Sequence, residues 1–161
     1  MTVNDGMYSS ATDQWATPPD FFAAVNAFWR FTLDVAADAS NAKCERYFTE
    51  EDDGLAQNWA GERCWLNPPY GRSIGLWMQK AYEEGQKPGT VVVALIPART
   101  DTRWWHSWVK DRAAHITFLP GRLHFGGSKN SAPFPSALVV YGVWWPVRVT
   151  LDEAPQLSML D

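Results

Sequence analysis

A continuous apolar run at residues 90–96 constrains the fold more than any other stretch of the chain. It reads Thr-Val-Val-Val-Ala-Leu-Ile and shows no alternation of polar and apolar residues. A strand with one face in water alternates, whereas a strand covered by helices on both faces is apolar throughout. The run therefore predicts a strand inside a parallel sheet of an α/β fold. At seven residues it is far too short to span a bilayer.

Strands and helices alternate along the rest of the chain. Further strands are expected at residues 31–36, 63–66, 115–119, 137–141 and 143–151, with a weaker candidate at 47–49. Helices are expected at residues 21–29, 74–84 and 104–110, and Thr17 or Asp20 is expected to cap the first of them. This order predicts an α/β fold with a mixed, mostly parallel sheet and with ligands at the carboxyl ends of its strands.

The length of 161 residues fits one domain. Residues 1–14 are polar and are expected to form a flexible arm, and residues 15–161 a single domain. The net charge of −4 argues against a nucleic-acid coat protein with a basic surface. It leaves room for an enzyme that holds nucleic acid locally, since most of the cations lie in the second half of the chain.

Other classes of protein are disfavoured by what the sequence contains. Two cysteines, Cys44 and Cys64, make neither a disulfide framework nor a zinc site, and the three histidines have no ligand spacing, so no metal is expected. No charged start followed by an apolar run marks a signal peptide. We expect a soluble, cytoplasmic protein with no membrane partner, and the sequence leaves its oligomeric state open.

The segment with the clearest chemistry is Asn67-Pro68-Pro69-Tyr70, which directly follows an expected strand. An amine on a planar ring is a poor nucleophile, because its lone pair is delocalised into the ring. Two acceptors aimed at its N–H bonds, the Asn67 side-chain oxygen and the Pro68 carbonyl, would localise that lone pair. The two prolines restrict the backbone, so this carbonyl would be held in place beforehand. Tyr70 offers a flat face on which an extruded base can stack.

The chain resembles the small phage-type DNA adenine-N6 methyltransferase (Dam) family from about Trp15 to Tyr141. The resemblance rests on several stretches in the family's order, at residues 15–18, 31–37, 41–44, 52–55, 65–72, 96–102 and 121–125, and on Trp59. It implies a Rossmann-like methyltransferase fold that binds S-adenosylmethionine and methylates adenine in DNA.

By this resemblance Asn67, Pro68, Pro69 and Tyr70 form the catalytic loop. The residues that match the methyl-donor site are Thr17 and Pro18, which close over the methionine part, Asp34 and Ala36 after the first strand, and Asp53 near the donor's adenine amine. The chain departs from many methyltransferases in having no glycine in the turn at residues 34–38. Alanine still permits a fairly close backbone approach. Asp38 is a candidate for the donor's ribose.

Three cations are candidates for DNA contact, each with a plainer interpretation beside it. Arg99 follows the buried strand and would hold phosphate or pair with Asp101. Arg122 would hold phosphate or fix a turn, and Lys129 would contact DNA loosely or be a plain surface lysine. Lys129 lies in the polar loop at residues 126–135, which we expect to read a short or relaxed recognition sequence. Trp59 and Trp65 are expected in the core.

Several alternatives remain open at this point. Asn67-Pro68-Pro69-Tyr70 also fits a plain turn, Asp34 a cap or turn residue, and Asp53 part of a solvated acidic run. The same loop would suit another planar amine, namely cytosine N4, an RNA adenine or a glutamine side chain. A non-catalytic nucleic-acid binding module and an inactive donor-binding relative are the remaining readings.

Overall fold

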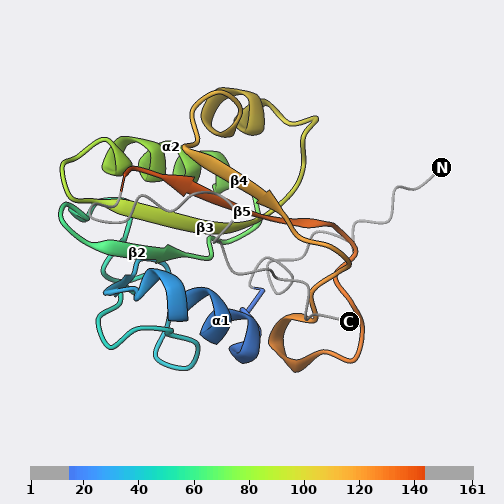
Figure 1. Cartoon of the computed structure of the whole chain (residues 1–161). Helices are drawn as coiled ribbons and strands as arrows, with labels where there is room; N and C mark the ends of the chain where they lie inside the picture. The colour runs from blue at the N-terminus through green and yellow to red at the C-terminus, as the bar shows by residue number, and fades with distance from the viewer. Residues whose placement is uncertain (1–14, 144–161) are drawn as a thin grey trace.

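The computed structural model describes residues 15–143 (Figure 1). The arm expected at residues 1–14 and all but the first residue of the strand expected at 143–151 lie outside this range. Five strands form one sheet in the order β1-β2-β3-β5-β4. The strands are β1 (Leu33–Asp34), β2 (Arg63–Leu66), β3 (Val91–Pro97), β4 (His115–Phe118) and β5 (Ser136–Tyr141).

Four of the five strands run in the same direction. β1, β2 and β3 pair in parallel, while β5 is antiparallel to both β3 and β4. The apolar run thus forms a strand buried at every residue, as expected. The expectation of a parallel environment holds on one side only, because the partner of β3 on its other side is antiparallel. The sheet is therefore mixed and mostly parallel.

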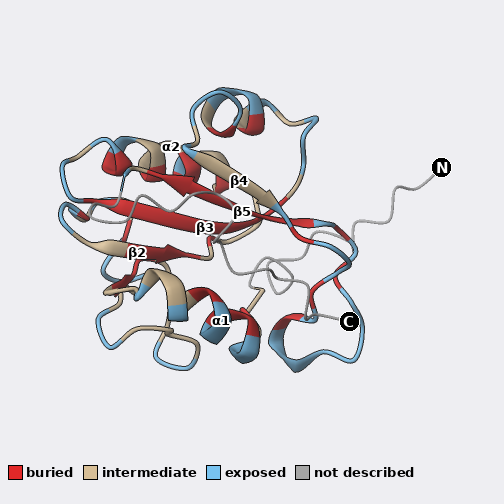
Figure 2. Cartoon of the chain, in the orientation of Figure 1, coloured by how far each residue is buried: buried red, intermediate tan, exposed pale blue. Residues whose placement is uncertain are grey.

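Helices cover both faces of the sheet, so the fold has three layers (Figure 1). α1 (Pro19–Trp29) lies on one face, and α2 (Ile74–Gly85) and the short π-helix η3 (Trp105–Val109) lie on the other. Successive residues of β3 point to opposite faces: Val93 packs on the α1 side and Val92 on the α2 side. Both layers of core meet on β3, which Figure 2 shows buried along its length.

Some expected elements differ from those observed. β1 has only two residues in place of six, although Thr32 and Val35 still donate backbone hydrogen bonds to β2. The strand expected at residues 47–49 is a single bridge between Tyr47 and Asp34. The helix expected at 104–110 is the five-residue π-helix η3.

The expected cap of the first helix is wrong. The residue at the cap position is Pro18, and no side chain caps the helix. Pro19 occupies the first helical position, where its missing N–H is not needed. As a result the Thr17 hydroxyl is not used by the helix.

Candidate active site

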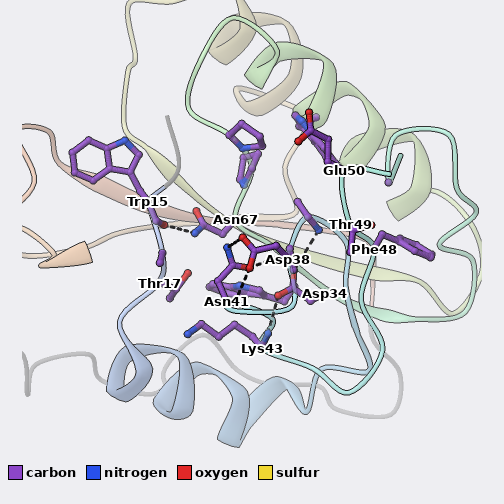
Figure 3. A pocket seen from close by; sticks show the side chains of 18 of the residues that line it. Trp15, Thr17, Asp34, Asp38, Asn41, Lys43, Phe48, Thr49, Glu50 and Asn67 are labelled. Atoms are coloured by element: carbon purple, nitrogen blue, oxygen red, sulfur yellow. Dashed lines mark hydrogen bonds between the residues drawn. The ribbon is translucent and has the colours of Figure 1, made fainter. Parts of the chain in front are cut away.

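A cavity of about 720 Å³ opens at the carboxyl ends of β1 and β2 (Figure 3). Its walls come from the segment at residues 15–17, the loop after β1, residues 48–55, the loop after β2 and the start of α2. Ligands of α/β sheets bind at this edge, and the volume suits a nucleoside-sized molecule. The two loops that the sequence singled out therefore meet at one cavity.

Asn67 lies where β2 ends, and its side-chain amide has a defined orientation. Its Nδ2 donates a hydrogen bond of 2.5 Å to the backbone carbonyl of Trp15. This contact assigns Oδ1 to the opposite side of the amide. Oδ1 is buried and has no hydrogen-bond partner among the described residues. A buried acceptor without a partner costs free energy, so a ligand N–H is the expected partner.

The rest of the predicted catalytic loop divides between the cavity and the core. Pro68 and Pro69 line the cavity, and no described residue donates a hydrogen bond to the Pro68 carbonyl. Tyr70 is not among the lining residues. Its hydroxyl donates to the Leu95 carbonyl at 2.9 Å, and burial raises the pKa of its phenol well above the ordinary value. Tyr70 is therefore a neutral phenol.

Asp34 ends β1 and organises the loop that follows. Its carboxylate accepts backbone hydrogen bonds from Ala36 at 3.3 Å and from Lys43 at 3.0 Å. Burial raises the pKa of Asp34 to about 6, although these two N–H groups act in the opposite direction. Asp34 thus serves the turn, as one of its two interpretations held, and it also lines the cavity together with Ala36.

Two other unpartnered groups lie in the same cavity wall. In the described part of the chain, the buried side-chain polar atoms without a partner are Thr17 Oγ1, Trp65 Nε1, Asn67 Oδ1 and Ser136 Oγ. The first three belong to residues that line the cavity. Pro18 is not a lining residue. Trp65 is buried as expected, yet it also faces the cavity, which the sequence did not predict.

The outer wall of the cavity carries acidic residues. Asp53 is exposed, lines the cavity and has a left-handed backbone with φ of 52°. Asp38 also lines the cavity, but both of its oxygens accept hydrogen bonds from Ser40 and Asn41 within its own turn. The Asp53 carboxylate is therefore more available to a ligand than that of Asp38.

The three cations chosen for DNA contact are all exposed and lie outside the cavity. Arg99 follows β3 and has its guanidinium 6.0 Å from the ring centre of Phe134. Arg99 and Asp101 do not form the ion pair considered above, and neither Arg122 nor Lys129 is paired with a described acid. Their charges are thus available at the surface.

Comparison with known proteins decides the family. The model of the DNA N-6-adenine-methyltransferase (Dam) family matches residues 6–141. The chain belongs to this family. It is 27% identical to the DNA N-6-adenine-methyltransferase of Haemophilus phage HP1, over 99% of each chain. It is 30% identical to the enzyme of that name from Escherichia phage T1, over 69% of this chain and 46% of the relative.

A third relative is the putative methyltransferase YfdM of Escherichia coli, which is 43% identical over 36% of this chain and 71% of its own length. The family and the names of the phage relatives indicate a DNA N6-adenine methyltransferase. No helix between residues 15 and 143 is long and apolar enough to cross a membrane. The same residues contain no group of three or more metal-ligating side chains.

Sequence reasoning missed the apolar side of this cavity. Phe48, Leu55 and Trp77 line it beside the acidic wall. Phe48 follows the single bridge of Tyr47 to β1, so it lies at the carboxyl end of a third parallel segment. The weak strand candidate at residues 47–49 was a sequence signal from which this apolar wall could have been predicted.

The raised pKa of Asp34 predicts a pH effect on stability. The folded state binds this proton more tightly than the unfolded state, whose pKa is near 3.8. The contribution of Asp34 to stability is therefore complete below about pH 4 and is lost as the pH rises through about 6. Relative to Asp34→Asn, which does not titrate, the native protein should lose about 2 kcal/mol of unfolding free energy between pH 4 and 7. Urea denaturation of both proteins across this range measures it, and a constant difference would contradict it.

Proposed function

We propose that the chain transfers a methyl group from S-adenosylmethionine to N6 of a DNA adenine that is flipped into the cavity beside Asn67. The fold proposed for this chemistry is the Rossmann-like methyltransferase fold, in a single catalytic domain without a separate target-recognition domain. The observation that carries the proposal is the buried Asn67 Oδ1, which is oriented as an acceptor and has no partner among the described residues.

S-adenosylmethionine fits the residues present. Thr17 and Trp65 line the cavity, and the buried Thr17 Oγ1 and Trp65 Nε1 have no hydrogen-bond partner among residues 15–143. Asp34 is ionised at neutral pH, since its pKa is about 6, and its charge favours a cationic ligand. The residues proposed to hold the donor are Thr17, Pro18, Asp34, Ala36 and Asp53, with the apolar wall beside them. When bound, the donor supplies an activated methyl group on a sulfonium.

The catalytic loop acts by orientation and electrostatics. Asn67 Oδ1 accepts one N–H of the adenine amine and the Pro68 carbonyl accepts the other, which concentrates the nitrogen lone pair toward the methyl group. Acceptors fixed in advance need little reorganisation during the reaction. Pro69 restricts the backbone that holds the Pro68 carbonyl. Tyr70 does not line the cavity itself and is proposed to meet the flipped base just beyond that lining. As a neutral phenol it does not accept the proton that N6 loses when the methyl group is transferred, and this proton passes to solvent.

DNA is proposed to lie on the side of β3 and β4. Arg99 follows β3, and Arg122 and Lys129 lie in the loop after β4, so all three unpaired cations are beyond the carboxyl ends of these strands. Cations near phosphates dominate affinity for DNA. The acidic residues at the cavity, Asp53 among them, lie on the other side of the catalytic loop, toward the donor.

Methyl transfer to competing substrates tests the proposal. The native protein is incubated with labelled S-adenosylmethionine and, separately, with unmethylated duplex DNA, single-stranded DNA, RNA and a glutamine-containing peptide. Mass spectrometry of the products should find N6-methyladenine from DNA. Label in RNA, at cytosine N4 or in the peptide would show that this molecule, and not adenine in DNA, is the substrate. Binding of DNA without any methyl transfer would favour the binding-module reading.

A further inference from the structure

Four aromatic side chains beside the catalytic loop form a cluster that we call the aromatic clasp: Trp15, Tyr70, Phe125 and Phe134. The ring of Trp15 meets Phe125 and Phe134 edge to face, with ring centres 5.6 and 5.1 Å apart. The ring of Tyr70 meets the same two rings at 6.1 and 5.6 Å, also edge to face. The clasp therefore joins the N-terminal segment, the catalytic loop and the loop after β4.

Backbone hydrogen bonds hold the same three segments together. Asn67 Nδ2 donates to the Trp15 carbonyl, and the Gly126 N–H donates to the Ala16 carbonyl at 2.9 Å. The Ala132 N–H closes the loop after β4 on the Leu123 carbonyl at 2.8 Å. The loop that carries Arg122 and Lys129 therefore contacts the segment of Trp15 directly. It does so through the Gly126 hydrogen bond and through the rings of Phe125 and Phe134.

The orientation of Asn67 matters because the two ends of its amide are chemically opposite. With Nδ2 on the Trp15 carbonyl, Oδ1 is left to accept an N–H in the cavity. If the Trp15 carbonyl moved away, no other hydrogen bond to a described residue would prevent the Asn67 amide from rotating by half a turn. The amide would then present N–H groups to the adenine amine, which is itself a donor.

We propose that the aromatic clasp positions the catalytic amide, so that Trp15, Phe125 and Phe134 are positioning residues for methyl transfer. The inference rests on the proposed function. The rings fix the backbone of Trp15, and the Trp15 carbonyl fixes Asn67. Arg99 lies over the ring of Phe134, 6.0 Å from its centre.

Kinetics of two clasp variants test the proposal. Trp15→Ala and Phe134→Ala should lower kcat by about 100-fold, the scale of a misplacement of about 1 Å. In Phe134→Ala, whose side chain does not line the cavity, the Kd values for S-adenosylmethionine and for DNA should change by less than about threefold, a difference that is small on the free-energy scale. Trp15→Phe, which keeps an aromatic ring in the clasp, should recover most of the lost kcat.

Trp108→Ala is the matched control. Trp108 is half-buried like Trp15, but it packs near Tyr82 and Arg112, away from the catalytic loop. It should lower the melting temperature to a similar extent and leave kcat unchanged. A folded Trp15→Ala protein with native kcat, or an equal loss of kcat in Trp108→Ala, would overturn the positioning role.

A measurement independent of activity separates this inference from the proposed function. In the native protein the side-chain amide of Asn67 should give a distinct NMR signal whose protons are slow to exchange with water. Trp15→Ala and Phe134→Ala should abolish this protection, and Trp108→Ala should keep it. If the native protein fails to methylate DNA, the proposed function fails, and the amide signal still decides the role of the clasp. Equal protection in all the variants would refute it.

Discussion

Replacement of Asn67 by alanine is expected to lower kcat for adenine methylation by about 10²–10³-fold, the usual effect of removing one preorganised hydrogen-bonding group. The variant lacks the only side-chain acceptor of the catalytic loop that is buried and without a partner among the described residues. Binding of S-adenosylmethionine should persist, because the donor is proposed to contact other residues. Steady-state kinetics and calorimetric titration of the donor measure the two effects. Full activity in Asn67→Ala would contradict the mechanism.

The variant Asn67→Asp separates the two functions of the amide. It keeps acceptor oxygens but, when ionised, has no hydrogen to donate to the Trp15 carbonyl. A carboxylate oxygen would then face that carbonyl at hydrogen-bond distance, and repulsion would turn the side chain out of position. We expect activity well below native at pH 8 and a relative gain as the pH falls, since a protonated carboxyl group can donate again. Native activity at pH 8 would show that the Trp15 contact is dispensable.

The buried centre of the fold could be predicted from the sequence because burial leaves a local trace. Residues 63–66 and 91–97 are strands within one residue of expectation, and apart from Arg63 their residues are apolar because helices cover both sheet faces. The direction of the neighbouring strand leaves no such trace. Apolar side chains pack equally well whether β5 runs parallel or antiparallel to β3, so only the three-dimensional pairing revealed the mixed environment.

Short elements at the sheet edge were less predictable. The segment at residues 47–49 pairs with β1 through a single bridge, because Asp34 uses its carboxylate and backbone to hold the loop on both sides of that bridge. The cap predicted for α1 was wrong because prolines determine where this helix begins. Two prolines set the start of the helix by their backbone, so the usual preference of a threonine for the cap position was not expressed.

The site was predictable where the chain itself brings residues to one sheet edge. Asp34 and Asn67 follow neighbouring parallel strands, and their meeting at one cavity follows from that topology. The position of Tyr70 could not be derived in this way. Its contacts are with Leu95, Phe125 and Phe134, which are 25 or more residues away in the sequence. Trp65 was missed for the opposite reason, because its burial concealed an unpartnered N–H in the cavity wall.

Trp59→Ala is expected to lower the free energy of unfolding by about 3–5 kcal/mol, the typical cost of removing a buried tryptophan. The Trp59 side chain is fully buried and stacks on Trp77, which lines the cavity. Its indole N–H donates to the Gly54 carbonyl at 2.9 Å. A total stability of about 5–15 kcal/mol is usual for a domain, so the variant should lose a large share of it and melt well below the native protein. Urea denaturation and circular dichroism measure the loss.

Trp59→Phe shows how this core residue reaches the cavity. Phenylalanine keeps most of the ring but leaves the Gly54 carbonyl without its donor, which should cost about 1–3 kcal/mol. Gly54 lies against the end of β1, where an added Cβ would be only 2.2 Å from the Val35 carbonyl oxygen. A shift of Gly54 therefore moves the part of the cavity wall that is proposed to hold S-adenosylmethionine toward the loop of Asp34. The folded variant should then bind S-adenosylmethionine more weakly than the native protein. An unchanged Kd for S-adenosylmethionine would show that Trp59 stabilises the core without affecting the cavity wall.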